Sequence, residues 1–438
     1  MSSLFNLKPK VNEMGMEASR VITLFGMFLI LSIPVAVPLS NKTGDIRSFI
    51  SLSSEEQYLI WSYRASASNV LEVSISSNGN YIAAGDIDGS VYLFSRSSST
   101  PLWDYSTGSI IRSVRISANG NYITVGLDNR VYFFIRDNGI PLWSYQTSGE
   151  IQIFFDVSPR VSISSDGNYI AAGGYGRFYL FRKDDDTPLW SYIPTDYLGP
   201  VTFAVSMSSD GNYIAAINDG LVYLFSKSDN KPLWLWSYHW HPISVSISAD
   251  GNYIAAGGPG ATGEVYLFGK ENNTSLRSYQ TGGSVNCLSM SSNGDYIVAG
   301  SGGKVYLFSR SENTPLWSYQ TGGQVDSVSI SSDGNYISAG SYDGNVYLFG
   351  RENNTPLWSY QTGGEVYSVS ISSDGNCIVA VNGWPDHKVY LFAGFRITKP
   401  PWALVIGIIV VATVIGITAA FYIRKMRLKR IKKRWRIS

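Results

Sequence analysis

One unit of forty-odd residues recurs eight times along this chain, and it constrains the fold more than any other feature. The most regular part of the unit is a turn, spelled SSDGNYI at residues 331–337. The glycine of this turn recurs at Gly79, Gly120, Gly167, Gly211, Gly251, Gly294, Gly334 and Gly375. Such spacings, between 40 and 47 residues here, are typical of propeller blades and of solenoid coils.

Each unit contains four short segments with the character of β-strands. Around Gly334 they are residues 325–330, 336–339, 346–349 and 356–360. They are rich in β-branched and aromatic residues, lack a helical period and are bounded by Asp-Gly, Gly-Gly and Asn-rich turns. Four such antiparallel strands, here called a to d, predict one propeller blade.

The count of strands predicts a closed ring. The last of the eight a-b-c sets ends at residues 389–392, and no d strand follows it. An isolated d-type segment, residues 59–63, instead precedes the first set. Pairing this segment with the last blade would leave no open sheet edge, an offset that an open solenoid does not need. The sequence therefore predicts an all-β, eight-bladed β-propeller over residues 57–394.

The repeat also resembles known families. The segments GNVYLF (344–349) and PLWSYQTGG (356–364) resemble the tryptophan-docking repeat of quinoprotein-like, or PQQ-like, eight-bladed propellers. The resemblance implies a tryptophan packed between neighbouring blades at Trp61, Trp103, Trp143, Trp190, Trp234, Trp317 and Trp358, with Arg277 as the departure. Residues 331–340 also resemble WD repeats, although Leu-Phe replaces the Trp-Asp pair and no repeat carries that family's His. These likenesses cover about three quarters of the chain and indicate fold rather than chemistry.

Catalytic quinoproteins, as the resemblance implies, hold their quinone with a calcium ion and two adjacent cysteines. This chain has only Cys287 and Cys377, ninety residues apart. Cys377 replaces the Tyr of the repeat and Cys287 replaces a Ser of strand a, so both are interpreted as buried substitutions rather than a disulfide. We therefore expect no cofactor, no metal and no enzymatic activity, with a quinone-dependent dehydrogenase as an alternative.

Both ends of the chain indicate a membrane. Residues 403–423 are uncharged and mostly apolar, about the length needed to span a bilayer. The tail, 424–438, carries nine basic and no acidic residues, which is typical of the cytoplasmic side. Residues 1–38 combine basic residues with an apolar run and are interpreted as a signal peptide or an uncleaved signal anchor. With linkers at 39–56 and 395–402, the propeller is expected outside the cytoplasm of a cell-membrane protein.

Charge and short motifs narrow the range of possible partners. Without residues 1–37 and the tail, 22 basic and 31 acidic residues remain, which argues against nucleic acid as a partner. Ala412, Gly416 and Ala420 lie at four-residue spacing, a seam that could support a weak homodimer. Candidate glycosylation sequons occur at Asn41, Asn272, Asn273 and Asn353.

Loop lengths vary on one side of the ring only. The a-b and c-d loops keep their lengths, whereas the d-a loop gains seven residues between Trp143 and Ile163 and four between Trp190 and Met207. The b-c loops gain up to three residues near 257–263 and 382–388. Because strand direction alternates, the b-c and d-a loops share one face, here called the variable face, and the a-b and c-d loops share the constant face. Binding residues usually lie on such variable loops, although neutral drift would give the same pattern.

Unusual side chains gather on the variable face. The candidate binding residues are Ile153, Phe154, Phe155, Tyr197, His239, Trp240, His241, Trp384, Asp386 and His387. The first three form an apolar patch for a partner or an extended strand folded back over blade 3. His239 with His241 could ligate a metal, and Asp386 with His387 could act as acid and base. Their loops lie three blades apart, however, and two ligands from one loop are too few for a closed zinc site.

These observations favour aromatic contacts to a protein or a sugar. The sequence therefore predicts a membrane-anchored propeller that binds a protein or a surface glycan through its variable face. A quinone-dependent enzyme and a purely structural scaffold of the cell envelope are the alternatives.

Overall fold

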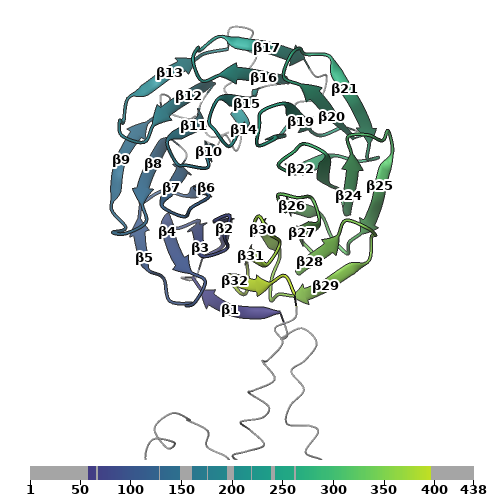
Figure 1. Ribbon diagram of the computed structural model, residues 1–438. Coiled ribbons are helices and arrows are strands. Elements are labelled where there is room, and N and C mark those ends of the chain that lie inside the picture. Colours follow the sequence, from purple (N-terminus) through teal and green to yellow (C-terminus); the bar gives the residue numbers. More distant parts are fainter. Residues whose placement is uncertain are drawn as a thin grey trace, which may run out of the picture. The chain divides into compact units, whose positions relative to one another are not determined.

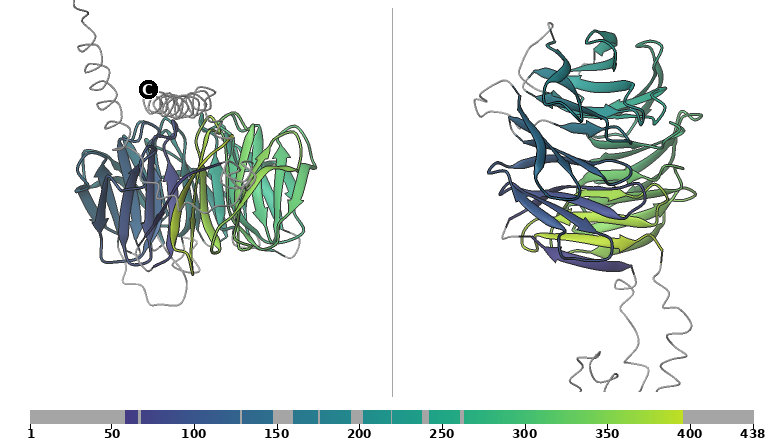
Figure 2. Two further views of the ribbon diagram at one scale, coloured as in Figure 1. Left: turned by 90° about the horizontal axis from the view of Figure 1, so that it is seen from below. Right: turned by 60° about the vertical axis from the view of Figure 1, so that its left-hand side comes forward.

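The computed structural model describes residues 58–65, 68–127, 129–147, 160–174, 176–194, 202–218, 220–237, 242–260 and 263–395. Within these ranges the chain forms eight four-stranded antiparallel sheets arranged as the blades of a ring (Figure 1). Figure 2 shows the same ring from its edge and obliquely. The predicted eight-bladed propeller is confirmed.

The strands of blades 1 to 4 have the following bounds. Blade 1 contains β2 (Val70–Ile75), β3 (Tyr81–Asp86), β4 (Ser90–Ser95) and β5 (Trp103–Ser106). Blade 2 contains β6 (Ile111–Ile116), β7 (Tyr122–Leu127), β8 (Arg130–Ile135) and β9 (Pro141–Gln146). Blade 3 contains β10 (Val161–Ile163), β11 (Tyr169–Gly174), β12 (Arg177–Arg182) and β13 (Pro188–Tyr192). Blade 4 contains β14 (Thr202–Met207), β15 (Tyr213–Asn218), β16 (Leu221–Ser226) and β17 (Pro232–Ser237).

Blades 5 to 8 complete the ring. Blade 5 contains β18 (Ser244–Ile247), β19 (Tyr253–Gly257), β20 (Glu264–Gly269) and β21 (Ser275–Gln280). Blade 6 contains β22 (Val285–Met290), β23 (Tyr296–Ser301), β24 (Lys304–Ser309) and β25 (Pro315–Gln320). Blade 7 contains β26 (Val325–Ile330), β27 (Tyr336–Ser341), β28 (Asn345–Gly350) and β29 (Pro356–Gln361). Blade 8 contains β30 (Val366–Ile371), β31 (Cys377–Asn382), β32 (Lys388–Ala393) and, as its outermost strand, β1 (Leu59–Arg64).

Strand β1 closes the ring as predicted. It runs antiparallel to β32, with Leu59 opposite Phe392 and Arg64 opposite Lys388. Blade 8 therefore consists of three strands from the C-terminal end of the propeller and one from its N-terminal end (Figure 1). The first and last strands of the described chain stabilise one another directly.

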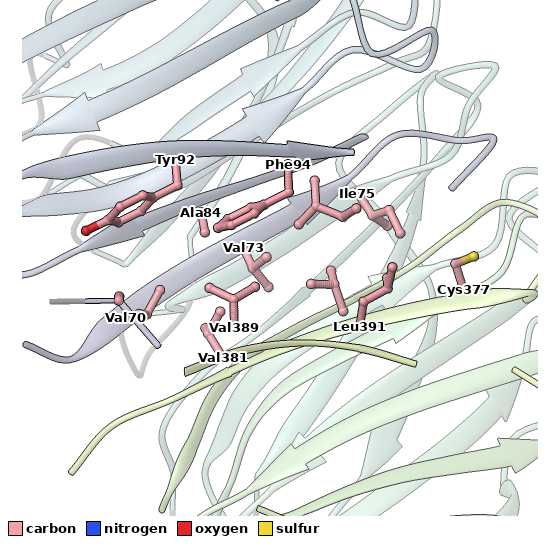
Figure 3. Close-up of a cluster of buried hydrophobic side chains, with 13 residues drawn as sticks. Val70, Val73, Ile75, Ala84, Tyr92, Phe94, Cys377, Val381, Val389 and Leu391 are labelled. Carbon is pink, nitrogen blue, oxygen red and sulfur yellow. The ribbon is translucent and has the colours of Figure 1, made fainter. Parts of the chain in front are cut away.

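The hydrophobic core lies between neighbouring blades. Each blade is a twisted sheet that packs both of its faces, so that strands b and c are apolar and buried along most of their length. The cluster between blades 8 and 1 joins Val379 and Leu391 to Val73, Ala84 and Phe94 (Figure 3). Full burial of such a side chain contributes about 1.5–3 kcal/mol. Equivalent clusters fill the other seams of the ring.

The a-b turns explain why the turn motif is so constant. In blade 7 the Ser331 hydroxyl donates to Asp333 Oδ1, which also accepts from the Asn335 amide, and Ser331 Oγ accepts from the Tyr336 amide. Gly334 has a positive φ of 74°, and a Cβ there would lie 2.5 Å from the ring of Tyr296 in the preceding blade. Both its backbone conformation and its close approach to that ring therefore favour glycine.

A cycle of backbone hydrogen bonds links all eight a-b turns. One amide in each turn donates to the equivalent carbonyl of the next blade, from Ser77 to Ala118 and onward, and Ser373 donates back to Ser77. The bonds are 2.9 to 3.0 Å long. The constant face thus has a hydrogen-bonded inner rim that depends on backbone geometry rather than on side-chain identity.

The tryptophans named above are docked between blades as the resemblance implies. Each indole N–H donates to a backbone carbonyl that follows strand c of the next blade, as in Trp317 to Arg351 at 2.8 Å. The same contact is made by Trp61, Trp103, Trp143, Trp190, Trp234 and Trp358. In blade 5, where Arg277 replaces the tryptophan, the fully buried Tyr279 donates its hydroxyl to the Ser309 carbonyl instead.

The described part of the chain contains no helix that is both long and apolar enough to cross a membrane. The apolar segments 21–37 and 403–423 lie outside the described residues.

Candidate binding face

Three of the candidate residues lie in the last b-c loop, between β31 and β32. Trp384 projects into solvent with 75% of its surface exposed, the largest exposed fraction among the large hydrophobic residues described. His387 is only 8% exposed, has a positive φ of 51° and has no hydrogen-bond partner on Nδ1. The loop therefore offers an aromatic side chain to a partner, whereas its histidine is enclosed.

Asp386 lies in a hydrogen-bond network within its own blade. Its carboxylate accepts from the Tyr390 hydroxyl and from Asn382, and it pairs with Lys388 at 2.8 Å. Burial raises the pKa of Asp386, but the hydrogen bonds from Lys388, Tyr390 and Asn382 outweigh this effect and hold the pKa below its ordinary value.

A strand c tyrosine also donates to an aspartate at the end of strand b or in the b-c loop in two other blades. Tyr92 donates to Asp86 at 2.9 Å and Tyr347 donates to Asp343 at 2.7 Å. A contact repeated in several blades is expected of a loop support. In the structure, Asp386 supports its own loop through these contacts, and its assignment as a binding residue remains a prediction.

The remaining candidates on the variable face lie outside the described residues. These are Ile153, Phe154, Phe155, Tyr197, His239, Trp240 and His241. Their assignment as binding residues remains a prediction. On the constant face, Asn272, Asn273 and Asn353 are exposed in c-d turns, and Asn41 lies outside the described residues.

A central cavity, not identified from the sequence, lies along the axis of the ring. It has a volume of about 620 Å³ and is lined by strand a of every blade. Most of the lining is serine and valine. Many of the serines face the adjacent blade, as where the Ser329 hydroxyl accepts from the Ile371 amide at 3.3 Å. In similar contacts between successive blades, the Ile116 amide donates to Ser74 Oγ and the Ile75 amide donates to Ser370 Oγ.

Charged and aromatic side chains interrupt this pattern, most of them at the start of strand a or in a b-c loop, toward the variable face. Arg115, the fifth residue of β6, lies nearer the constant face. Glu72 in β2 accepts from Arg115 of β6 at 3.1 Å and from Arg160, next to β10, at 3.3 Å. The Ser368 hydroxyl of β30 also donates to Glu72 at 3.2 Å. This single carboxylate, with its side chain 13% exposed, therefore connects blades 8, 1, 2 and 3.

A second group lies on blades 7 and 8. Asp326 of β26 accepts from Gln324 at 2.8 Å. The rings of Tyr342 and Tyr367 meet edge to face, with centroids 6.0 Å apart. Burial and the neighbouring Asp326 carboxylate raise the pKa of Tyr342. Both tyrosines therefore remain protonated and able to donate near neutral pH.

The charged residues of the cavity occupy positions at which the aligned repeats differ from one another. The position five residues before the turn glycine is serine in every blade but one, where it is Arg115. The position seven before it varies between Ser, Ala, Cys, Glu and Arg, and the next position outward is more diverse still. The departures from the repeat thus increase from the constant toward the variable face.

The residues present do not fit the quinone site that the resemblance implies. Both cysteines are free thiols on different blades. Cys377 is buried beneath Gly79, at the place where other blades have tyrosine, as expected. Cys287 is partly exposed as a residue, although burial raises the pKa of its thiol to about 12. Within the described ranges, no group of three or more His, Cys, Asp or Glu side chains could hold a metal ion.

Comparisons with known proteins agree on the fold. The WD domain, G-beta repeat, matches residues 272–309 and 313–349. No curated protein matches the chain. Among solved structures, Chaetomium thermophilum Sqt1 bound to the N-terminus of the ribosomal protein L10 is similar, with TM-score 0.64 and 19% identity over 76% of this chain and 99% of that chain. The computationally designed protein Ika8 has TM-score 0.64 and 15% identity over 77% of this chain and 99% of that chain.

A second family model covers more of the chain. The model described as outer membrane protein assembly factor BamB, one of the PQQ-like repeats, matches residues 48–279, more than half of the sequence. Together with the eight closed blades and their docked tryptophans, this match shows that the chain belongs to that PQQ-like repeat family.

Proposed function

We propose that this protein is a membrane-anchored binding protein whose propeller recognises a partner protein through its variable face. The observation that carries the proposal is the one-sided departure from the repeat. The constant face is built from near-identical turns joined by backbone hydrogen bonds. The exposed Trp384 and the charged end of the cavity both belong to the other face.

Two further observations support a protein partner. WD-repeat propellers commonly act as protein-binding scaffolds, and two repeats here match that model. The similar Sqt1 structure is bound to a segment of another protein. Exposed aromatic side chains are favoured anchors in protein interfaces because they bury a large area at little entropic cost.

The proposed location rests on the sequence at the two ends of the chain. An apolar run of membrane-spanning length followed by a basic tail favours an extracytoplasmic propeller and a cytoplasmic C-terminus. A cysteine placed at the exposed Asn313 should react with a membrane-impermeant maleimide in intact cells. A cysteine replacing Ser438 should react only after permeabilisation. The opposite labelling pattern would place the propeller in the cytoplasm.

Site-specific crosslinking tests the binding face. A photo-crosslinking residue at Trp384, on the variable face, should capture a discrete protein in intact cells, and one at Asn313, on the constant face, should not. Equal crosslinking from both faces would contradict a binding face. Fixed neighbours in stoichiometric amounts from both positions would favour the structural scaffold, and a crosslinked product that is sensitive to glycosidases would favour a glycan.

A further inference from the structure

The charged residues of the central cavity face each other across the ring. Arg115 belongs to blade 2 and Arg160 to blade 3, whereas Asp326, Tyr342 and Tyr367 belong to blades 7 and 8. In an eight-bladed ring blade 7 is diametrically opposite blade 3, and β10 and β26 lie on opposite sides of the axis in Figure 1. The cavity therefore has a cationic wall and an anionic wall.

The cationic wall has donors beyond those that Glu72 uses. A guanidinium group carries five N–H donors, and each arginine gives Glu72 one of them. Arg115 also donates to the Val114 carbonyl and Arg160 to the Arg112 carbonyl, so that other donors of each group remain. The side chains of Arg115 and Arg160 are 40% and 46% exposed, so other donors are open to the cavity. A single guanidinium group can bind a carboxylate through two parallel hydrogen bonds. This wall is therefore well suited to a ligand that carries a carboxylate.

The anionic wall combines charge with aromatic rings. The Asp326 carboxylate accepts from Gln324 and is hydrogen-bonded to Tyr342, which is 39% exposed beside Tyr367. An ammonium or guanidinium group is attracted both to a carboxylate and to the faces of tyrosine rings. This wall therefore complements a lysine, an arginine or a free amino terminus.

From these two walls we propose that the cavity binds a short peptide segment of the partner that carries both a carboxylate and a basic group, held across the axis of the ring. This inference rests on the proposed function, because it assigns the cavity to the same protein partner. A volume of about 620 Å³ is typical of sites for small ligands and holds a few residues, not a folded domain. Because serines already satisfy strand a backbone amides, recognition would come from the charged side chains rather than from an added strand.

Peptide binding to the full-length protein tests the inference. The probes are fluorescein-labelled heptapeptides, acetylated and amidated, built from Gly and Ser with one Glu and one Lys at varied spacing. Matched pools carry only Glu or only Lys. The mixed pool should raise fluorescence anisotropy, and either single-charge pool should bind at least about tenfold more weakly. Equal affinity of all three pools would overturn the proposal.

Variants on each wall localise the binding. Arg160→Gln and Asp326→Asn should each weaken binding of the mixed pool by about tenfold or more. Arg182→Gln and Asp186→Asn make the same changes of charge on the constant face and should have no effect. A loss with the constant-face variants equal to that with the cavity variants would contradict the proposal. Since Arg160 also supports Glu72, the melting temperature of each variant is measured, and Asp326→Asn provides the test if Arg160→Gln is destabilised.

Two outcomes separate this inference from the proposed function. If free lysine or glutamate displaced the peptides completely, the site would be one for a small amino acid and the peptide inference would be wrong. If no peptide bound while crosslinking from Trp384 persisted, the cavity inference would fail and the proposed function would stand. If peptides bound and no crosslink formed from Trp384, the cavity inference would stand and the Trp384 loop would be excluded as a contact site for the partner.

Discussion

At the scale of single residues, blade 5 shows how the ring accommodates the loss of a docking tryptophan. Arg277 takes the tryptophan position, with its Nε buried and unpaired. Tyr279, two residues later, is fully buried and bonds to the next blade, whereas its equivalent Tyr319 in blade 6 remains partly exposed. The interblade hydrogen bond is therefore retained by a different side chain.

Tyr279→Phe should cost about 1 kcal/mol of unfolding free energy, because it removes the hydrogen bond between blades 5 and 6 and leaves the Ser309 carbonyl with only the Glu312 amide of its own blade. Tyr319→Phe should change the stability by less than about 0.5 kcal/mol, as expected for a site without such a bond. Chemical denaturation of the two variants measures the difference. Equal losses would show that blade 5 does not depend on this hydroxyl.

Trp317 tests the docking contact itself. Trp317→Ala should lower stability by about 3–5 kcal/mol because it empties a buried aromatic site. Trp317→Phe should cost about 1 kcal/mol for the lost N–H to Arg351, plus the smaller ring. The adjacent Leu316 is 44% exposed, so Leu316→Ala serves as the control and should be nearly neutral. Calorimetry that ranked Leu316→Ala beside Trp317→Ala would contradict interblade docking.

Contacts that recur in each blade could be predicted from the repeat, whereas contacts that occur only once could not. The docking tryptophans and the position of Cys377 beneath a neighbouring turn are set by contacts that recur in each blade. The group formed by Glu72, Arg115 and Arg160 joins blades through side chains that occur once each. The repeat pattern does not predict which of these unique side chains meet, because that depends on how the blades are arranged in the closed ring.

At the scale of elements, the a-b turn is an internal comparison of aspartate with asparagine. Blades 3, 4, 5, 7 and 8 use an aspartate in the turn, and blades 1, 2 and 6 use Asn78, Asn119 and Asn293. The asparagines make the same two contacts through Oδ1, as where Asn78 Oδ1 accepts from the Ser76 hydroxyl and the Asn80 amide. The aspartates accept one more hydrogen bond, as where Asp333 Oδ2 accepts from Asn335 Nδ2. The two residues therefore share the turn geometry but differ in charge and in this contact.

The aspartate turns should lose stability in acid. Burial opposes ionisation of Asp166, but the hydrogen bonds from Ser164 and Asn168 together outweigh it and hold the pKa of Asp166 below the ordinary value. The same holds in the other four turns. With a folded pKa below the unfolded one, this stability is complete above the unfolded pKa of about 3.9 and is lost as pH falls through the folded pKa. Replacing all five by asparagine should lower the melting temperature at pH 7, because the hydrogen bonds to the charged carboxylates are lost, and should reduce its fall below pH 4. An unaltered pH profile would exclude the turns as the source.

Some of the elements could be predicted from the sequence and others could not. Strands and tight turns were predictable because residues close in the chain determine them. The b-c loop at Trp384 was not, because the enclosure of His387 and the pairing of Asp386 with Tyr390 depend on the neighbouring strand. The exposure of Trp384 is compatible with the predicted aromatic contact site. His387, predicted to act with Asp386 as acid and base, is instead buried in the loop.

At the scale of the whole molecule, strand β1 should be essential for the ring. Deleting residues 57–65 removes the partner of β32 and the Trp61 contact to Arg96. The exposed edge of β32 would then favour aggregation. We expect a lower melting temperature and higher oligomers in size-exclusion chromatography. A monomer that melted like the intact protein would show that the ring closes without β1.

The pairing of β1 with β32 also means that the ring has no intrinsic first blade. Its order around the axis is cyclic, and the position of the chain ends only determines which blade is assembled from two distant segments. A circularly permuted chain, with residues near 58 and 395 joined by a short linker and new ends opened in a c-d turn, would retain every interblade seam. The location of the ends is therefore free to vary, and here it places the first and last strands of the described chain, β1 and β32, side by side in a single blade.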